Sequence, residues 1–158
     1  MTQELFIRIL ADGSLIPIML LGAYALIFKV PKGQRLQSYK RILIAGLTAY
    51  LVAKLFSSIY QPLSERPFEV LGTTAGASFL NNPGFPSDHA LFAAAITCAV
   101  WFETKQKWIS ISLIGLTILL CIGRVLALVH TPADVIGGVV IAMIGALWYL
   151  NDKPLLTK

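Results

Sequence analysis

The residues best suited to chemistry lie in the segment 123–134, where an apolar run ends in GRVLALVHTPAD. His130 and Asp134 are four positions apart. Thr131 and Pro132 between them are typical of a helix start, with threonine at the N-cap and proline at the first helical position. Four positions is about one helical turn, so the carboxylate can reach the imidazole. A carboxylate on one ring nitrogen fixes the tautomer and leaves the other nitrogen free to attack or to accept a proton.

The same spacing has a purely structural interpretation. Thr131 and Asp134 also fit a capping box, in which the acid accepts a hydrogen bond from a backbone N–H at the helix start. For this motif taken alone, both interpretations stay open.

A second polar cluster ends the longest predicted loop, which spans residues 62–88. It reads GFPSDH from Gly84 to His89, and an apolar helix is predicted to start at once. Pro-Ser-Asp is suitable capping chemistry, and the backbone N–H groups of a helix start form an anion site. His89 and His130 are the two histidines of the chain, and each lies at the end of an apolar run.

Two histidines and several cations suit phosphoryl transfer. One histidine, held by Asp134, can act as a nucleophile, while the other acts as a general acid and then as a base for water. Arg124, Arg66 and Lys54 add positive charge, and Ser87 adds a hydroxyl and helix-start N–H groups. This set matches a phosphoryl group, whose transition state spreads negative charge over three equatorial oxygens.

Neither a metal nor a cofactor is expected. Asp88 and Asp134 are too few carboxylates for a metal site. Cys98 and Cys121 both lie inside apolar runs, with neither disulfide nor metal spacing, and are interpreted as small buried hydrophobic residues.

The composition predicts a membrane protein. The chain has 158 residues, of which 56% are hydrophobic and 13% charged, and this is too apolar for a soluble domain of this size. One membrane-embedded domain, 1–158, is the natural division. The net charge of +5 could indicate nucleic-acid binding, but the few charges lie between apolar runs, so orientation in a bilayer explains them better. No nucleic-acid partner is predicted.

The apolar runs predict an all-α fold, a compact bundle of five transmembrane helices at residues 14–30, 42–61, 87–102, 108–129 and 132–150. Residues 1–12 are predicted to form a short interfacial amphipathic helix, with a signal peptide as the alternative. The third span is short for a bilayer, so its outer end is predicted to lie below the membrane surface. Lys54, inside the second span, either snorkels to a headgroup or faces a polar cavity.

The charges predict the orientation. Residues 29–41 carry five basic side chains and no acid, which places this segment in the cytoplasm. Alternation of the spans then puts both polar clusters on the extracytoplasmic side of the plasma membrane. Two spans separate the clusters, so they share one face in either orientation.

Three motifs together resemble the signature of the type 2 phosphatidic acid phosphatase superfamily. They are Arg66-Pro67, then Pro86-Ser87-Asp88-His89, then Gly123-Arg124 with His130 and Asp134. The resemblance implies a helical membrane core and a phosphohistidine formed on His130. It also implies that Asp134 orients His130, that His89 protonates the leaving oxygen, and that Arg66, Ser87 and Arg124 bind the phosphate.

Three positions depart from the pattern of that superfamily. Eleven residues separate Lys54 from Arg66, more than is usual, so either the extra loop at 62–65 absorbs the difference or Lys54 is not a phosphate ligand. Asp88 replaces a glycine, keeping its backbone N–H but adding an acid near the phosphate. Gly123 stands where serine is common.

Within the superfamily, Arg66-Pro67-Phe68, Phe85-Pro86-Ser87-Asp88-His89 and the small size are similar to bacitracin-resistance undecaprenyl-pyrophosphate phosphatases. The resemblance therefore implies metal-independent hydrolysis of a membrane lipid, a polyprenyl (undecaprenyl) pyrophosphate, to the monophosphate. A phosphatase for phosphatidylglycerol phosphate, phosphatidate or another polyprenyl phosphate is the alternative, and a non-enzymatic transporter or scaffold is a remote one. The superfamily also contains vanadium haloperoxidases, which are soluble proteins, so the predicted membrane spans exclude that activity. The sequence makes no prediction of oligomeric state.

Overall fold

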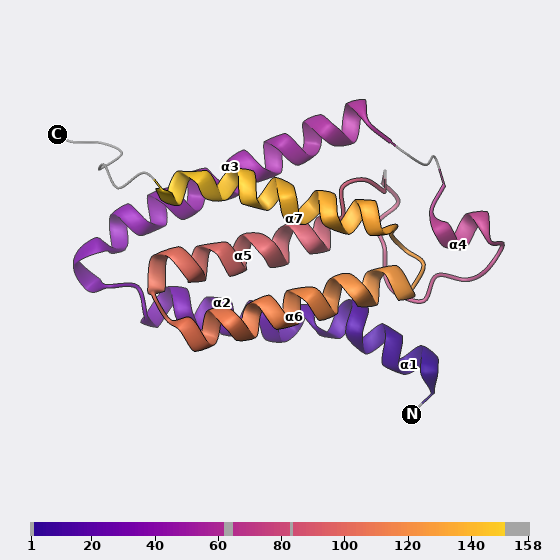
Figure 1. The fold of residues 1–158 in the computed structure, drawn as a ribbon, viewed down its shortest axis with the longest axis horizontal. Helices are drawn as coiled ribbons and strands as arrows, with labels where there is room; N and C mark the ends of the chain where they lie inside the picture. Colours follow the sequence, from indigo (N-terminus) through magenta and orange to yellow (C-terminus); the bar gives the residue numbers. More distant parts are fainter. Residues whose placement is uncertain (1, 62–64, 83, 151–158) are drawn as a thin grey trace.

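The computed structural model describes residues 2–61, 65–82 and 84–150, and every regular element in these ranges is helical (Figure 1). This confirms the predicted all-α fold class. The elements are α1 (Gln3–Arg8), a π-helical turn (Ile9–Gly13), α2 (Leu15–Phe28), a 3₁₀ turn (Lys32–Gln34), α3 (Arg35–Ile59), α4 (Pro67–Val70), α5 (Asp88–Thr104), α6 (Lys107–Leu126), α7 (Pro132–Ala146) and a 3₁₀ turn (Leu147–Leu150). The predicted tail at 151–158 and residues 62–64 of the extra loop lie outside the described ranges.

The long helices run side by side along the longest axis of the molecule, with α5 in the middle (Figure 1). Helix α5 contacts α2, α3, α6 and α7. One end of the bundle, on the right in Figure 1, gathers α1 and α4, the end of α3, the end of α6 and the starts of α5 and α7. Both polar clusters of the sequence therefore lie at the same end.

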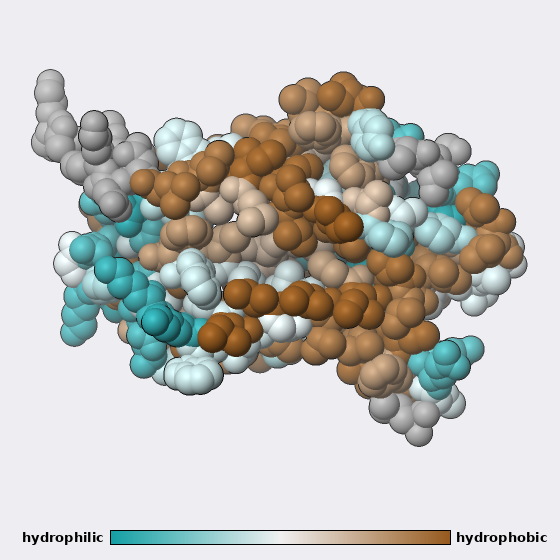
Figure 2. All heavy atoms as spheres, in the orientation of Figure 1, coloured by the Kyte–Doolittle hydropathy of each residue, from teal (hydrophilic) through white to brown (hydrophobic). Residues whose placement is uncertain are grey.

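Four helical segments are long and apolar enough to cross a membrane: Gln3–Phe28, Lys32–Ile59, Lys107–Leu126 and Pro132–Leu150. Helix α5 has 17 residues. Helices α2 and α7 have fewer residues, but each is extended by a neighbouring helical turn, whereas α5 is not. Large hydrophobic side chains are exposed along the middle of the bundle, and hydrophilic residues gather towards its ends (Figure 2). Lipid is the solvent in which such a surface is stable. Four of the five predicted spans correspond to these segments, and the fifth, 87–102, corresponds to α5, which lies in the middle of the bundle.

The predicted N-terminal helix is present as α1, and it continues into the bundle. Helix α1, the π-helical turn and α2 follow one another with no extended break. No residue of α1 is buried, but Ala11 in the turn is fully buried and packs with Ala77, Ala127 and Val129. The segment is therefore part of the bundle at the end that carries the polar clusters.

The opposite end is fixed by an ion pair. Helix α3 begins at Arg35, seven residues before the predicted span, so half of the basic segment is helical. Arg41 donates to both carboxylate oxygens of Glu103, at 2.7 and 2.9 Å, and ties α3 to the end of α5. Bidentate pairing of this kind fixes geometry as well as adding energy.

The starts of α5 and α7 lie in close contact. A Cβ added at Gly138 would lie 2.6 Å from the carbonyl oxygen of Ser87 and 2.9 Å from the backbone nitrogen of Leu91. Small residues at helix interfaces allow backbones in membranes to approach one another in this way. The absence of a side chain at position 138 thus allows the first turn of α5 to lie directly against α7.

Candidate active site

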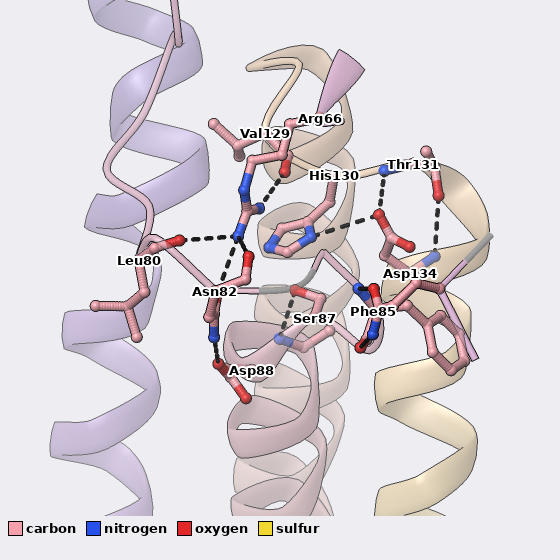
Figure 3. A network of polar contacts seen from close by, with 12 residues as sticks. Arg66, Leu80, Asn82, Phe85, Ser87, Asp88, Val129, His130, Thr131 and Asp134 are labelled. Carbon is pink, nitrogen blue, oxygen red and sulfur yellow. Dashed lines mark hydrogen bonds and ion pairs between the residues drawn. The ribbon is translucent and has the colours of Figure 1, made fainter. Parts of the chain in front are cut away.

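The first turn of α7 holds the histidine–aspartate pair. The Thr131 hydroxyl accepts a hydrogen bond from the backbone N–H of Asp134 at 3.2 Å, and Asp134 Oδ2 accepts one from the Thr131 N–H at 2.7 Å. This is a complete capping box. The same Oδ2 lies 3.5 Å from Nδ1 of His130 (Figure 3). One carboxylate therefore serves both as the helix cap and as the neighbour of the imidazole.

The contact between His130 and Asp134 is long. At 3.5 Å it falls within ion-pair range but outside good hydrogen-bond geometry, and Nδ1 has no other partner among the described residues. Both side chains are almost fully buried. In Figure 3 the edge of the ring opposite Asp134 is directed towards the side of the site that carries Arg66, Asn82 and Ser87. That edge carries Nε2, the nitrogen left for chemistry.

A backbone hydrogen bond joins the second cluster to the first. The Ser87 N–H donates to the backbone carbonyl of Asp134 at 3.0 Å. Ser87 is the N-cap of α5, and its hydroxyl accepts from the Ala90 N–H at 3.5 Å. His89 follows in the first turn of α5 and is half-buried. The structure thus brings both histidines to one end of the bundle.

Arg66 organises the loop over the site. Its Nη1 donates to the carbonyl of Val129 at 2.6 Å, and Nη2 donates to the carbonyls of Leu80 and Asn82 and to Asn82 Oδ1 (Figure 3). The ring of Phe79 lies 5.2 Å from the guanidinium carbon. The predicted phosphate ligand therefore already binds four oxygens of the chain itself, and it fixes the loop to the segment before α7.

Asn82 was not singled out in the sequence. Its side chain accepts from Arg66 at 2.9 Å and donates to Asp88 Oδ2 at 3.0 Å, so it links the two (Figure 3). The amide thereby links the carboxylate of Asp88, in the first turn of α5, to the loop. An asparagine in a loop rich in glycine and proline carries no pattern that would have identified it.

Arg124 also has a partner that sequence reasoning missed. Its Nη1 donates to Asp12 Oδ1 at 2.9 Å, and its side chain is only 1% exposed. Asp12 comes from the π-helical turn at the start of the chain. The one signal in the sequence was that a buried guanidinium needs an anion, and the chain has only eight acids to supply it.

Lys54 lies apart from this network. Its side chain is exposed, with Nζ 5.4 Å from the centre of the Tyr50 ring. No hydrogen bond or ion pair joins it to the other candidate residues within the described part of the chain. It does line an apolar groove of about 580 Å³ that Asp88 and Leu80 also line.

Burial sets the electrostatics of the site. It lowers the pKa of His130 from the usual 6.5, and the contact with Asp134 acts in the opposite direction, while Arg124 and Arg66 lower it further. The imidazole is therefore neutral at neutral pH, which leaves a lone pair on one nitrogen. Burial likewise lowers the pKa of Arg66, against which Asp134, Glu69 and Asp88 act. Nowhere in the described ranges do three His, Cys, Asp or Glu side chains gather as metal ligands would.

Comparison with known proteins agrees with the motifs. The sequence profile of the PAP2 superfamily matches residues 37–157. The undecaprenyl-diphosphatase BcrC of Bacillus subtilis (strain 168) is 30% identical over 123 residues, which are 76% of this chain and 62% of that protein. The match thus spans less than two thirds of the relative's length. No solved structure gives a significant match.

Proposed function

Since the chain belongs to the PAP2 superfamily, we propose that it is a membrane lipid phosphatase that hydrolyses undecaprenyl pyrophosphate to the monophosphate. The observation that carries this proposal is the junction of two helix starts. Asp134 faces His130 at 3.5 Å, and its backbone carbonyl binds the N–H of Ser87, two residues before His89. A nucleophile, its orienting acid and a second histidine are therefore held by one turn of each of two packed helices.

In the first step His130 is the nucleophile. Nε2 attacks the terminal phosphorus, the bond from phosphorus to the bridging oxygen breaks, and the lipid monophosphate leaves with a proton from His89. Asp134 holds the proton on Nδ1 and stabilises the imidazolium as positive charge develops on the ring. The product of this step is a phosphohistidine at position 130.

In the second step water resolves the intermediate. His89, now neutral, accepts a proton from water, whose oxygen attacks phosphorus as the bond to Nε2 breaks. Inorganic phosphate leaves, and both histidines return to their starting states. Each histidine is thus used twice, and no metal takes part in either step.

The phosphate is bound by cations and by the start of α5. Arg124 and Arg66 supply guanidinium groups, and the N–H groups and hydroxyl at Ser87 supply neutral donors at a helix N-terminus. Asp88 supplies its backbone N–H. Lys54 is proposed as a peripheral ligand of the pyrophosphate, because it lines the same groove as Asp88.

Two observations support a lipid rather than a soluble substrate. The groove beside Asp88 and Lys54 continues between α3 and α5 and is lined mainly by apolar residues, among them Leu91, Ala95 and Ile96. The relative from Bacillus subtilis is named for undecaprenyl diphosphate.

The basic segment 29–41 lies at the opposite end of the bundle from the site (Figure 1). The proposed location is therefore the plasma membrane, with the site facing outward.

The test is a substrate panel on purified protein in detergent, read as phosphate released. Undecaprenyl pyrophosphate, phosphatidylglycerol phosphate and phosphatidate are compared, with His130→Ala as the blank. The proposal expects the pyrophosphate to be preferred, with turnover unaffected by chelator and blocked by vanadate. Turnover that needs added magnesium would contradict the mechanism, and preference for another lipid would replace the substrate while keeping the chemistry.

A further inference from the structure

Asp12 binds two segments that lie far from it in sequence. Its Oδ1 accepts from Nη1 of Arg124 at 2.9 Å, and its Oδ2 accepts from the backbone N–H of Ser78 at 3.0 Å. Arg124 belongs to the last turn of α6, and Ser78 to the loop that Arg66 fixes over the site. The carboxylate thus bridges the N-terminal segment, α6 and this loop.

The backbone around Asp12 is built to make this contact. Residues Ile9–Gly13 form a π-helical turn, a feature frequent at functional sites. The turn packs directly on Gly123, where an added Cβ would lie 2.5 Å from the backbone nitrogen of Ala11 and from the carbonyl carbon of Leu10. Only glycine permits this approach one residue before Arg124. Glycine at position 123 therefore lets the π-helical turn lie directly against α6.

The pairing with Asp12 leaves part of the guanidinium unused. The side chain has five donors, and its one hydrogen bond within the described residues is made by Nη1. Nε is buried and has no partner among the described residues. A buried unsatisfied donor calls for an explanation, and a phosphoryl oxygen is an acceptor suited to a guanidinium.

Further contacts hold Asp12 in this position. Its second oxygen accepts from the Ser78 N–H, and the two residues before it, Leu10 and Ala11, pack directly against Gly123. Arg124 also acts electrostatically on both histidines. The position in which Asp12 holds Arg124 therefore affects the two histidines, although Asp12 itself touches none of the reacting atoms.

We infer that Asp12 is a positioning residue, which holds Nη1 of Arg124 so that the remaining donors of the guanidinium face the substrate phosphate. This inference rests on the proposed function, in which Arg124 binds phosphate. It extends the active site to the N-terminal segment, which lies outside the part of the chain matched by the superfamily profile.

The experiment compares Asp12→Asn with Glu4→Gln, which removes an exposed acid from α1, and with Asp12→Glu, which keeps the charge. Three quantities are measured in detergent: kcat and KM on undecaprenyl pyrophosphate, binding of orthovanadate by calorimetry, and the thermal unfolding midpoint. Misplacement of a substrate-orienting group by about 1 Å can cost 10²-fold, so Asp12→Asn is expected to lower kcat/KM by about ten- to a hundredfold and to weaken vanadate binding about tenfold. Asp12→Glu should recover part of both, and Glu4→Gln should match the wild type.

Two results would overturn the inference. A lowered unfolding midpoint with unchanged kcat/KM and vanadate affinity would show that Asp12 only stabilises the fold, and tighter vanadate binding in Asp12→Asn would show that it shields Arg124. If the wild type released phosphate from no lipid, the proposed function would fail. Vanadate binding would then test the role of Asp12 separately, because it needs no turnover. Weaker vanadate binding in Asp12→Asn than in the wild type would support the positioning role.

Discussion

The backbone N–H of Ser87 donates a 3.0 Å hydrogen bond to the backbone carbonyl of Asp134. This bond joins the cap of α5 to the first turn of α7, and so joins the two sequence clusters that carry the histidines. One turn further along α7, Gly138 packs against the carbonyl of Ser87. The geometry of the site therefore depends on how closely two helices approach over a single turn.

The first prediction concerns this approach. Gly138→Ala places a methyl group 2.6 Å from the Ser87 carbonyl, which must shift. We expect a loss of about 1–3 kcal/mol in stability, typical of an overpacked contact, and a marked fall in kcat. Thermal unfolding and phosphate release measure the two. Gly115→Ala on α6 is the control, because nothing lies within 4 Å of the added carbon. Equal behaviour of the two variants would show that the contact is not needed.

Asp134 has two tasks that substitutions can separate. Asp134→Asn keeps an oxygen that can accept from the Thr131 N–H but removes the charge that faces His130. We expect kcat to fall by about 10²–10⁴, the range of general acid–base effects, with little change in unfolding midpoint. Thr131→Val removes the hydroxyl cap and should cost about 1 kcal/mol of stability while leaving kcat near that of the wild type. If Asp134→Asn lost stability and kept its rate, capping would be its whole role.

The protonation of His130 can be observed directly. With two histidines in the chain, His89→Gln leaves His130 as the single imidazole. Because burial lowers its pKa, NMR titration of an untagged sample should give a midpoint below 6.5. The ring is protonated below that pH and loses its nucleophilic lone pair, so the neutral nucleophile persists into mildly acidic solution. Adding Asp134→Asn removes the contact that raises the pKa and should move the midpoint lower still. A midpoint above 6.5 would contradict this account.

The sequence was sufficient for the local parts of the site. Apolar runs predicted the helices, and alternation of spans correctly put both clusters at one end. The spacing of His130 and Asp134 predicted their contact because one helical turn fixes it. Distant contacts carried no such pattern. Asp12 and Arg124 are 112 positions apart, and their pairing depends on a π-helical turn and on the packing at Gly123, neither of which periodicity reveals.

The hydrogen-bond partners of Arg66 could not be predicted from the sequence either. Its place in the site followed from the motif, but its partners did not, because three of them are backbone carbonyls. Main-chain oxygens are present at every residue and leave no mark in the sequence. Which of them meet an arginine depends on the path of the loop between α3 and α5.

Arg66 is therefore predicted to act on the loop as well as on the phosphate. Arg66→Lys replaces a planar group of five donors with a flexible ammonium, which cannot reach the carbonyls of Val129 and Leu80 together. Hydrogen exchange should become faster at amides of residues 66–82, and kcat/KM should fall. Arg8→Lys, an exposed arginine on α1, is the matched control. Unchanged exchange in Arg66→Lys would mean that these hydrogen bonds do not hold the loop.

The central claim is a covalent phosphate on His130. The most direct test mixes the enzyme with lipid pyrophosphate that is labelled in its terminal phosphate and stops the reaction by rapid quench. Wild type and His89→Gln are stopped under alkaline conditions and digested, and the peptides are analysed by mass spectrometry. The account predicts an acid-labile phosphate on the peptide that contains His130 of the wild type, and slower formation of it in His89→Gln, which lacks the acid of the first step. Label on another residue, or none in either protein while phosphate is still released, would contradict it.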